Sequence, residues 1–225
     1  MKPSICAVFD IDDTLYLERD YVRSGFQAVG DWAARWLDIA DFGDRCWCRF
    51  QAGRRQVIFD EVLRESGYEP VSGLVGALVE IYRTHTPVIT LCADAKAALH
   101  SISEIASVAV ITDGPAVSQS RKVEALGLHD VARPIILTDV LGTEFRKPHS
   151  RAFEQVMSCR PAGQYIYIAD NPVKDFTAPR QLGWLTVRVR RPGGLHSGVA
   201  SLAVTPDLEI TDCSPLLEGL MRLSR

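Results

Sequence analysis

Short apolar runs that end in polar residues recur along this chain and alternate with segments of helical period. The first run extends from Ile5 to Phe9 and contains no charged residue. Such a run is typical of a strand buried in a parallel sheet. Strands are predicted at residues 5–9, 108–111, 135–137, 165–168, 185–190 and 208–210, and helices at residues 95–105, 118–125, 172–181, 215–223 and after Pro148. This alternation predicts an α/β fold with a parallel sheet.

One long block of the chain carries no strand signal. Between residues 16 and 86, apolar residues such as Val22, Phe26 and Val29 recur at the spacing of a helix with one buried face. Helices are predicted near residues 20–36, 45–50, 57–66 and 74–86, with Asp20 as the N-cap of the first. Because the block interrupts the sheet after its first strand, we predict an inserted all-helical cap at residues 16–86. The core would then consist of residues 1–15 and 87–225.

An acidic cluster follows the first predicted strand. Asp10, Asp12 and Asp13 lie within four residues, at the carboxyl end of a strand, which faces the ligand crevice in open α/β sheets. Their mutual repulsion is costly there, and Mg²⁺ is the usual hard cation for oxygen ligands of this kind. Turns and helix caps use the same residue types. The cluster alone therefore leaves both interpretations open, and for Asp13 a turn or cap is favoured.

Three later segments carry matching chemistry. Thr112-Asp113-Gly114 follows a predicted strand, where a hydroxyl and the free backbone N–H groups of a glycine-containing turn suit a phosphate. Lys147 precedes a predicted helix, and Asp170 follows the strand at 165–168, with Asp175 five residues later. A turn or a solvated lysine would explain each segment separately. Four such features in this order favour a site.

On these residues the chain resembles the haloacid dehalogenase superfamily of hydrolases, most of whose members are phosphatases. The family's four motifs correspond here to Asp10, Asp12 and Thr14, to Thr112, to Lys147, and to Asp170 with Asp175. The commonest form of the last motif has Gly where this chain has Ala169. The resemblance implies a Rossmann-like parallel sheet core with an inserted all-helical cap. It also implies Mg²⁺-dependent hydrolysis of a small phosphate monoester through an aspartyl-phosphate.

The resemblance further implies a role for each residue. Asp10 would be the nucleophile, Asp12 the general acid and base, and Asp175 a residue that orients the metal site or Lys147. Mg²⁺ would be held by Asp10, the backbone carbonyl of Asp12, and Asp170. The phosphoryl group would be bound by Thr112, by N–H groups at Asp113 and Gly114, and by Lys147, which would also neutralise charge on the nucleophile.

The same residues argue against two other reactions of this superfamily and leave two alternatives open. Haloacid dehalogenases lack the second aspartate, which is Asp12 here. A phosphonatase needs a Schiff-base lysine from the cap, and residues 16–87 contain no lysine. A sugar phosphomutase shares both the motifs and the cap, so it stays open, as does a regulatory protein on an inactive phosphatase fold. In the predicted cap, Arg45, Arg49, Arg54 and Arg55 would suit an anionic substrate, although a solvated helix face is the commoner use.

Composition narrows the class of protein, its cellular compartment and its partners. The chain has 225 residues, of which 47% are hydrophobic, enough for a globular core with an insertion. The net charge of −3 gives no reason to expect a nucleic-acid or membrane partner, and no apolar stretch approaches the ~18 residues of a membrane span. Six scattered cysteines and an N-terminus that leads directly into a strand favour a reduced cytoplasmic protein. The expected partner is a small phosphorylated metabolite, either a sugar phosphate or a nucleotide.

Overall fold

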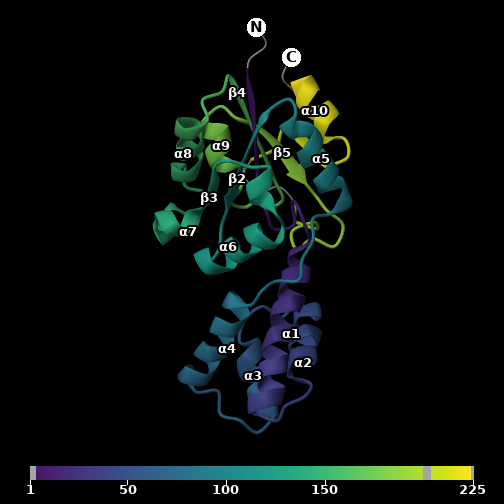
Figure 1. Ribbon diagram of the computed structural model, residues 1–225, viewed down its shortest axis with the longest axis vertical. Coiled ribbons are helices and arrows are strands. Elements are labelled where there is room, and N and C mark those ends of the chain that lie inside the picture. The colour runs from purple at the N-terminus through teal and green to yellow at the C-terminus, as the bar shows by residue number, and fades with distance from the viewer. Residues whose placement is uncertain (1–3, 200–203, 224–225) are drawn as a thin grey trace. The chain divides into compact units, whose positions relative to one another are not determined.

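The computed structural model describes residues 4–199 and 204–223 and contains two compact units (Figure 1). The core unit comprises the chain up to Glu18 and from Thr90 onward, and the helical unit comprises Arg19–Ile89. These boundaries lie three residues after those predicted from the sequence. The physical reason is that the two segments that join the units are hydrogen-bonded to the core unit. The Glu18 N–H donates to Asp13 Oδ1 at 2.9 Å, and the Cys92 N–H donates to the Leu15 carbonyl at 2.9 Å.

The core unit is built on one six-stranded sheet whose neighbouring strands are all parallel. Its order is β3-β2-β1-β4-β5-β6, which confirms the predicted α/β class. The strands are β1 (Ile5–Phe9), β2 (Ser107–Thr112), β3 (Ile135–Leu137), β4 (Gln164–Ala169), β5 (Leu185–Val189) and β6 (Leu208–Ile210). The strand order reverses between β1 and β4, and a ligand crevice opens at such a switch point, outside the carboxyl ends of the strands. Phe9 lies opposite both Val110 and Ile168, so the residues after β1, β2 and β4 reach the same edge of the sheet.

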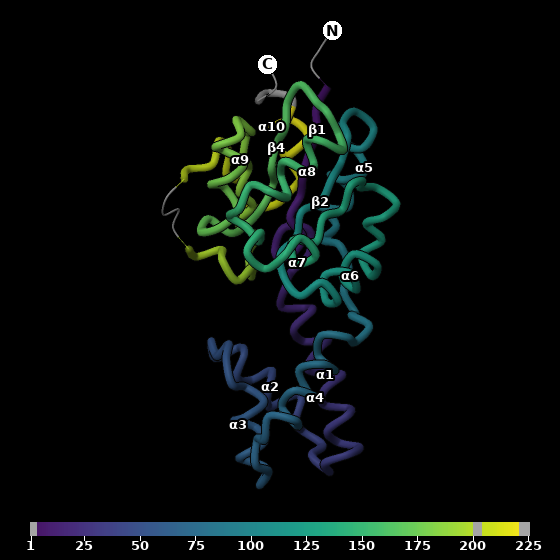
Figure 2. Tube along the Cα trace, turned by 90° about the vertical axis from the view of Figure 1, so that its left-hand side faces the viewer, coloured from purple at the N-terminus to yellow at the C-terminus, as the bar shows by residue number. Residues whose placement is uncertain are grey.

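Helices cover both faces of this sheet. The core unit contains α5 (Ala93–Ser103), α6 (Ala116–Ala125), α7 (Thr138–Leu141), α8 (Arg151–Cys159), α9 (Thr177–Gln181) and α10 (Leu216–Leu223), with short 3₁₀ turns at Leu128–Asp130 and Thr143–Phe145. Helices α8 and α9 lie on one face, and α5 and α10 on the other (Figure 1). Strands β1, β2 and β4 run through the middle of the unit (Figure 2). On the α8 face, Phe153 packs edge-on against Tyr167 and Trp184 in the hydrophobic core.

Two predicted helix starts in the core and helical units are wrong. The helix predicted from Pro172 begins only at Thr177. The reason is a turn at Asn171, whose side-chain oxygen accepts the Val173 N–H and whose backbone carbonyl accepts the Asp175 N–H. The first helix of the helical unit begins at Glu18, so Asp20 lies inside it and is not its N-cap. The carboxylate of Asp13 accepts the Glu18 N–H instead. Helix α7 was not predicted.

The helical unit contains α1 (Glu18–Trp36), α2 (Phe42–Gln51), α3 (Ile58–Glu65) and α4 (Ser72–Thr84). An aromatic cluster fills its interior, with the Phe26 ring 6.0 Å from Phe59 and 5.6 Å from Tyr82 between centroids. Helices α1 and α2 approach closely at Gly43, where an added Cβ would lie 2.6 Å from the Phe26 carbonyl oxygen. The helical insertion therefore has its own core.

The structure describes the cysteines and the helices that composition was used to interpret. All six cysteines are free thiols, and Cys6, Cys46 and Cys213 are buried. Burial raises the pKa of Cys6 to about 11, so this thiol is inert at neutral pH. Within residues 4–199 and 204–223, no helix combines the length and the apolar character that crossing a membrane requires.

Arg191 ties the loop after β5 to the rest of the core unit. This side chain is 7% exposed, donates to both Asp94 oxygens at 3.0 and 2.8 Å, and donates to the Thr14 carbonyl at 2.9 Å. Replacing it by methionine would leave Asp94 and the Thr14 carbonyl without these donors. We expect Arg191→Met to lower the free energy of unfolding by about 2 kcal/mol, measured by urea denaturation. The exposed Arg121→Met is the control, with an expected loss below about 0.5 kcal/mol; equal losses would contradict this role of Arg191.

Candidate active site

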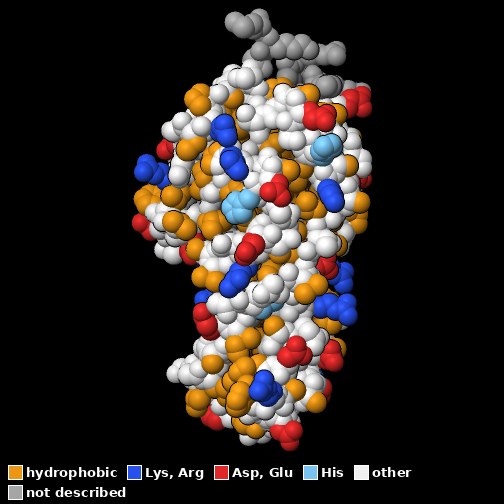
Figure 3. Space-filling view, in the orientation of Figure 1, with side chains coloured by type: hydrophobic (Ala, Val, Ile, Leu, Met, Phe, Trp, Pro, Cys, Tyr) orange, Lys and Arg blue, Asp and Glu red, His pale blue; other side chains and the backbone are white. Residues whose placement is uncertain are grey.

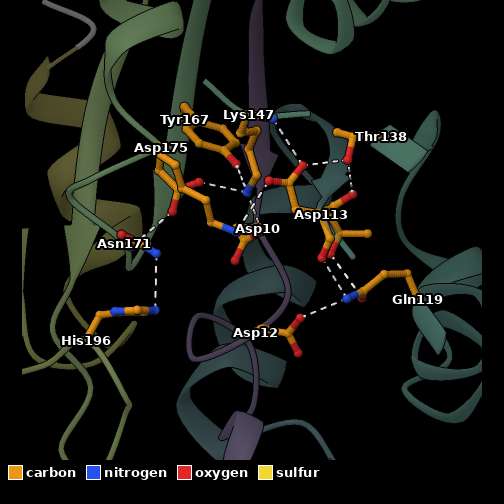
Figure 4. Close-up of polar contacts among 12 residues, drawn as sticks. Asp10, Asp12, Asp113, Gln119, Thr138, Lys147, Tyr167, Asn171, Asp175 and His196 are labelled. Carbon is orange, nitrogen blue, oxygen red and sulfur yellow. Dashed lines mark hydrogen bonds and ion pairs between the residues drawn. The ribbon is translucent and has the colours of Figure 1, made fainter. Parts of the chain in front are cut away.

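The predicted site residues meet at the carboxyl edge of the sheet, at the switch point between β1 and β4. Asp10 directly follows β1 and donates its N–H to the Ile168 carbonyl of β4 at 2.9 Å. Asp170 directly follows β4, and Thr112 is the last residue of β2. Figure 4 shows the side chains of Asp10, Lys147 and Asp175 directed toward one another. The parallel register of the strands is what brings these segments together.

Asp10, Asp170 and Asp175 form a buried group of three carboxylates. Each offers an oxygen within 4.8 Å of the others. Burial raises the pKa of Asp10 to about 6, against the opposing charge of Lys147. Burial also raises the pKa of Asp170 well above its usual range, and the charges of Asp175 and Asp10 add to this effect. Buried carboxylates this close together favour a bound cation, and an all-oxygen donor set fits Mg²⁺.

Lys147 lies beside two of these carboxylates with its side chain fully buried. Its Nζ is 2.7 Å from Asp10 Oδ1, 2.7 Å from Asp175 Oδ1 and 3.0 Å from the Tyr167 hydroxyl. These three contacts match the three donors of an ammonium group. Burial alone would lower the pKa of Lys147, but the charges of Asp10 and Asp175 outweigh it and raise the pKa well above the usual value. The lysine therefore stays charged.

Asp175 also braces the loop that carries Asp170. Its Oδ2 accepts the Asn171 N–H at 2.9 Å, while its Oδ1 contacts Lys147. Asp175 therefore connects Lys147 to the turn after β4.

The Asp12 side chain points away from this group, toward α6 (Figure 4). Lys122 Nζ lies 2.7 and 2.9 Å from its two oxygens, and Gln119 Nε2 lies 3.0 Å from Oδ2. The Tyr16 hydroxyl also donates to Oδ1. Burial by itself would raise the pKa of Asp12, but the charge and hydrogen bonds of Lys122, with those of Tyr16 and Gln119, hold the pKa below its usual value. Asp12 is a carboxylate in this structure.

The turn after β2 is fixed by its own side chains. The buried Thr112 hydroxyl donates to Gln119 Oε1 at 3.1 Å. The Asp113 carboxylate accepts from the Lys147 N–H at 3.2 Å and from the Thr138 hydroxyl. Burial by itself would raise the pKa of Asp113, but the charges of Lys147 and Lys174 outweigh burial and lower that pKa. An ionised carboxylate repels phosphate, so any phosphate contact of Asp113 must come from its backbone.

Four residues with no role predicted from the sequence contact the predicted site residues. They are Tyr16, Gln119, Lys122 and Tyr167, each within hydrogen-bond distance of Asp12, Thr112 or Lys147. A usable signal was present for two of them: Gln119 and Lys122 are polar residues three apart, which share one face of a helix, and that face is buried. Asp13 behaves as the favoured interpretation requires, since its carboxylate caps Glu18 and accepts the Leu195 N–H at 2.6 Å.

The four arginines singled out in the helical unit are used within that unit. Arg45 lies 2.8 Å from Glu65, Arg49 lies 3.3 Å from Glu61, and Arg54 pairs with Glu61. The Arg55 guanidinium lies over the Phe50 ring, 4.1 Å from its centroid. Acidic and basic side chains are interspersed on the face of this unit that Figure 3 shows. These arginines therefore fit a structural use on a solvated helix face better than a substrate-binding use.

Curated relatives of the chain cover nearly its whole length. A glyceraldehyde 3-phosphate phosphatase of Methanopyrus kandleri is 26% identical over 233 aligned positions, which cover 97% of each protein. A protein of the same name from Methanocaldococcus jannaschii is 26% identical over 81% of this chain and 83% of its own.

Solved structures share the fold. YfnB from Bacillus subtilis, crystallised bound to magnesium, superposes with a TM-score of 0.68 at 19% identity and covers 97% of this chain and 99% of its own. A 2-haloacid dehalogenase from Pseudomonas syringae superposes with a TM-score of 0.67 at 21% identity, covering 98% and 99%. The haloacid dehalogenase-like hydrolase family itself matches residues 6–183. With its motif residues gathered at the β1/β4 switch point, this chain belongs to the haloacid dehalogenase-like hydrolases.

Proposed function

We propose that this protein is a Mg²⁺-dependent phosphatase that hydrolyses a small phosphate monoester through an aspartyl-phosphate on Asp10. One observation carries the proposal. The Asp10 carboxylate, buried among Asp170 and Asp175, lies 2.7 Å from the ammonium group of Lys147 at the switch point of the sheet. A carboxylate can attack an anionic phosphorus only where positive charge screens the repulsion, and this site provides that charge.

The steps follow from the side chains. An Asp10 oxygen attacks phosphorus while the bond to the leaving oxygen breaks and Asp12 gives that oxygen a proton. In the second step, the Asp12 carboxylate takes a proton from water, which attacks phosphorus, releases phosphate and regenerates Asp10. Lys147 offsets negative charge throughout, with Asp175 and Tyr167 holding it in place. The backbone N–H groups at Asp113 and Gly114 bind phosphoryl oxygens, and so does the Thr112 hydroxyl once it turns away from Gln119 Oε1.

The ionisation of Asp12 adds one requirement. The structure holds Asp12 as a carboxylate, which is the form that accepts a proton from water in the second step. To act as the acid in the first step, Asp12 must first gain a proton. A phosphate monoester in its monoanionic form carries one, because the second pKa of such a group is about 6.

The metal would be held by Asp10, Asp170 and the backbone carbonyl of Asp12. When bound, Mg²⁺ would screen charge between the nucleophile and the phosphoryl group. The support is that Asp10 and Asp170 lie close together in a buried group of carboxylates, whose oxygens suit a hard cation, and that the similarly folded YfnB binds magnesium.

The substrate is proposed from the curated relatives. Both are named glyceraldehyde 3-phosphate phosphatases, so a small sugar phosphate is the first substrate class to test and nucleotides are the second. The use of the helical unit as a cap and a cytoplasmic location remain predictions. Dehalogenation is disfavoured by the carboxylate at Asp12.

The test of the proposed function is phosphate release. Purified protein is assayed with p-nitrophenyl phosphate, glyceraldehyde 3-phosphate and ~100 other phosphorylated metabolites, each with Mg²⁺ or with a chelator. Release of phosphate from at least one ester, only with the metal, is the expected result. No release from any ester overturns the proposal, and a phosphorylated isomer in place of free phosphate indicates a phosphomutase.

Asp12→Asn is expected to affect esters unequally. An amide cannot transfer a proton, so kcat/KM for an alkyl phosphate should fall by about 100-fold or more. The fall for p-nitrophenyl phosphate should be smaller, because its leaving group needs little protonation. Steady-state kinetics on both esters measure the ratio, with the exposed Asp130→Asn as control. Equal losses on the two esters would count against Asp12 as the general acid.

A further inference from the structure

Three side chains surround the Asp12 carboxylate, and the roles described so far do not explain why. Lys122 contacts both carboxylate oxygens, Gln119 contacts one, and Tyr16 contacts the other. These four contacts engage both oxygens of the carboxylate, two at each. The carboxylate plane is therefore fixed from two segments that are more than 100 residues apart in sequence.

The two residues from α6 are buried at a cost. Lys122 is 3% exposed and Gln119 is 2% exposed. The two residues are three positions apart and therefore lie on the same face of α6. Lysine and glutamine are rarely buried unless they are paired, because desolvation penalises them. A helix that only covered the sheet would place apolar side chains on this face.

Gln119 links three predicted site residues. Its Nε2 donates to Asp12 Oδ2 at 3.0 Å and to the Asp113 carbonyl at 2.8 Å, while its Oε1 accepts the Thr112 hydroxyl at 3.1 Å. The turn leaves room for this amide at Gly114, where φ is 136° and an added Cβ would lie 2.5 Å from Nε2. The turn after β2 is thus shaped around Gln119.

We propose that Lys122 and Gln119 are positioning residues for Asp12. They hold its carboxylate in the one orientation from which it gives the leaving oxygen a proton and takes a proton from the attacking water, and they touch neither the substrate nor the metal. This inference rests on the proposed phosphatase function. It assigns to the buried face of α6 a part in proton transfer that acts through Asp12.

Leaving-group dependence tests this role. Lys122→Met keeps the length of the side chain and removes its charge and hydrogen bonds. We expect kcat/KM for an alkyl phosphate to fall by roughly tenfold more than kcat/KM for p-nitrophenyl phosphate, because only the alkyl leaving group depends on the aligned acid. The exposed Lys96→Met, which carries the same substitution on α5, should leave the ratio unchanged.

A double-mutant cycle separates positioning from a structural or substrate-binding role. In the Asp12→Asn background, Lys122→Met should produce no further change in the alkyl-to-aryl ratio, since its effect passes through Asp12. Additive changes in the ratio overturn the proposal. A ratio in the Lys122→Met single variant that stays at the wild-type value, or that rises, overturns it as well.

A second variant keeps the test decisive if Lys122→Met does not fold. Gln119→Met removes one of the four contacts to the Asp12 carboxylate and no charge, so it should lower the ratio in the same direction by a smaller factor. Its loss of the Thr112 contact should change KM equally for both esters. An unchanged ratio with a folded Gln119→Met protein overturns the proposal. Failure of the proposed function is distinguishable, because wild-type protein would then release no phosphate from either ester.

Discussion

Asp10→Asn protein is expected to fold normally and to release no phosphate. An amide is a poor nucleophile, so loss of the covalent step should raise the barrier by at least ~4 kcal/mol, or about 1,000-fold in rate. Lys147 would keep its contacts to Asp175 and the Tyr167 hydroxyl. Burial raises the pKa of Asp10 to about 6, so ionised Asp10 destabilises the metal-free fold at neutral pH, and removing its charge should cost little stability.

Three measurements check this expectation. Steady-state phosphate release gives the loss of rate, thermal unfolding confirms the fold, and acid quenching with mass spectrometry detects the phosphoenzyme in the wild type and its absence in the variant. The exposed Asp130→Asn controls for the change of Asp to Asn and should retain full activity. Undiminished turnover in folded Asp10→Asn protein would rule out the aspartyl-phosphate mechanism.

Removal of Mg²⁺ is expected to have the next largest effect, on both activity and stability. Chelation should bring phosphate release to background. At about 100 times its Kd, a metal that binds only the folded state adds ~2.7 kcal/mol, which corresponds to an increase of about 5–10 °C in Tm for a chain of this size. Asp170→Asn should remove most of this increase, while Asp130→Asn should keep it.

The pH dependence of this stabilisation has a defined sign. Folding raises the pKa of Asp10 and Asp170, so between the unfolded value near 4 and the folded value of about 6 for Asp10, the folded state binds more protons than the unfolded state. Metal-free stability should therefore fall as pH rises through that window. A bound cation offsets the repulsion, so the Mg²⁺-induced increase in Tm should be larger at about pH 7.5 than at about pH 5.

Thermal unfolding with chelator or with Mg²⁺ at both pH values measures this difference. The charge-neutral variant Asp170→Asn should show a weaker pH dependence without metal, because one of the two titrating carboxylates is gone. A Mg²⁺ effect of equal size at both pH values would contradict the proposal that these carboxylates bind the metal.

The elements of the core were largely predictable because their signals are local. Each apolar run specified a strand within a few residues. The residues at the ends of β1, β2 and β4 were identified as site candidates from their positions, their side-chain chemistry and the family resemblance together. Helix starts were less well predicted: α9 begins at Thr177 and not near Pro172, because Asn171 bonds two backbone N–H groups in a turn. Competition between a side-chain turn and a helix is decided by packing, which the pattern of apolar residues does not report.

By itself, the sequence determined the parallel α/β class, the position of the helical insertion and the set of acidic and basic residues available for chemistry, because hydrophobic period and motif spacing are properties of neighbouring residues. Only the tertiary structure decided which groups meet. Lys122 reaches Asp12 across 110 positions, and Leu195 reaches Asp13 across 182. It also decided ionisation: burial raises the pKa of Asp10 and Asp170, while Lys122 keeps Asp12 charged. Desolvation and long-range pairing depend on what surrounds a side chain in space, and that follows from the packing of the whole core unit.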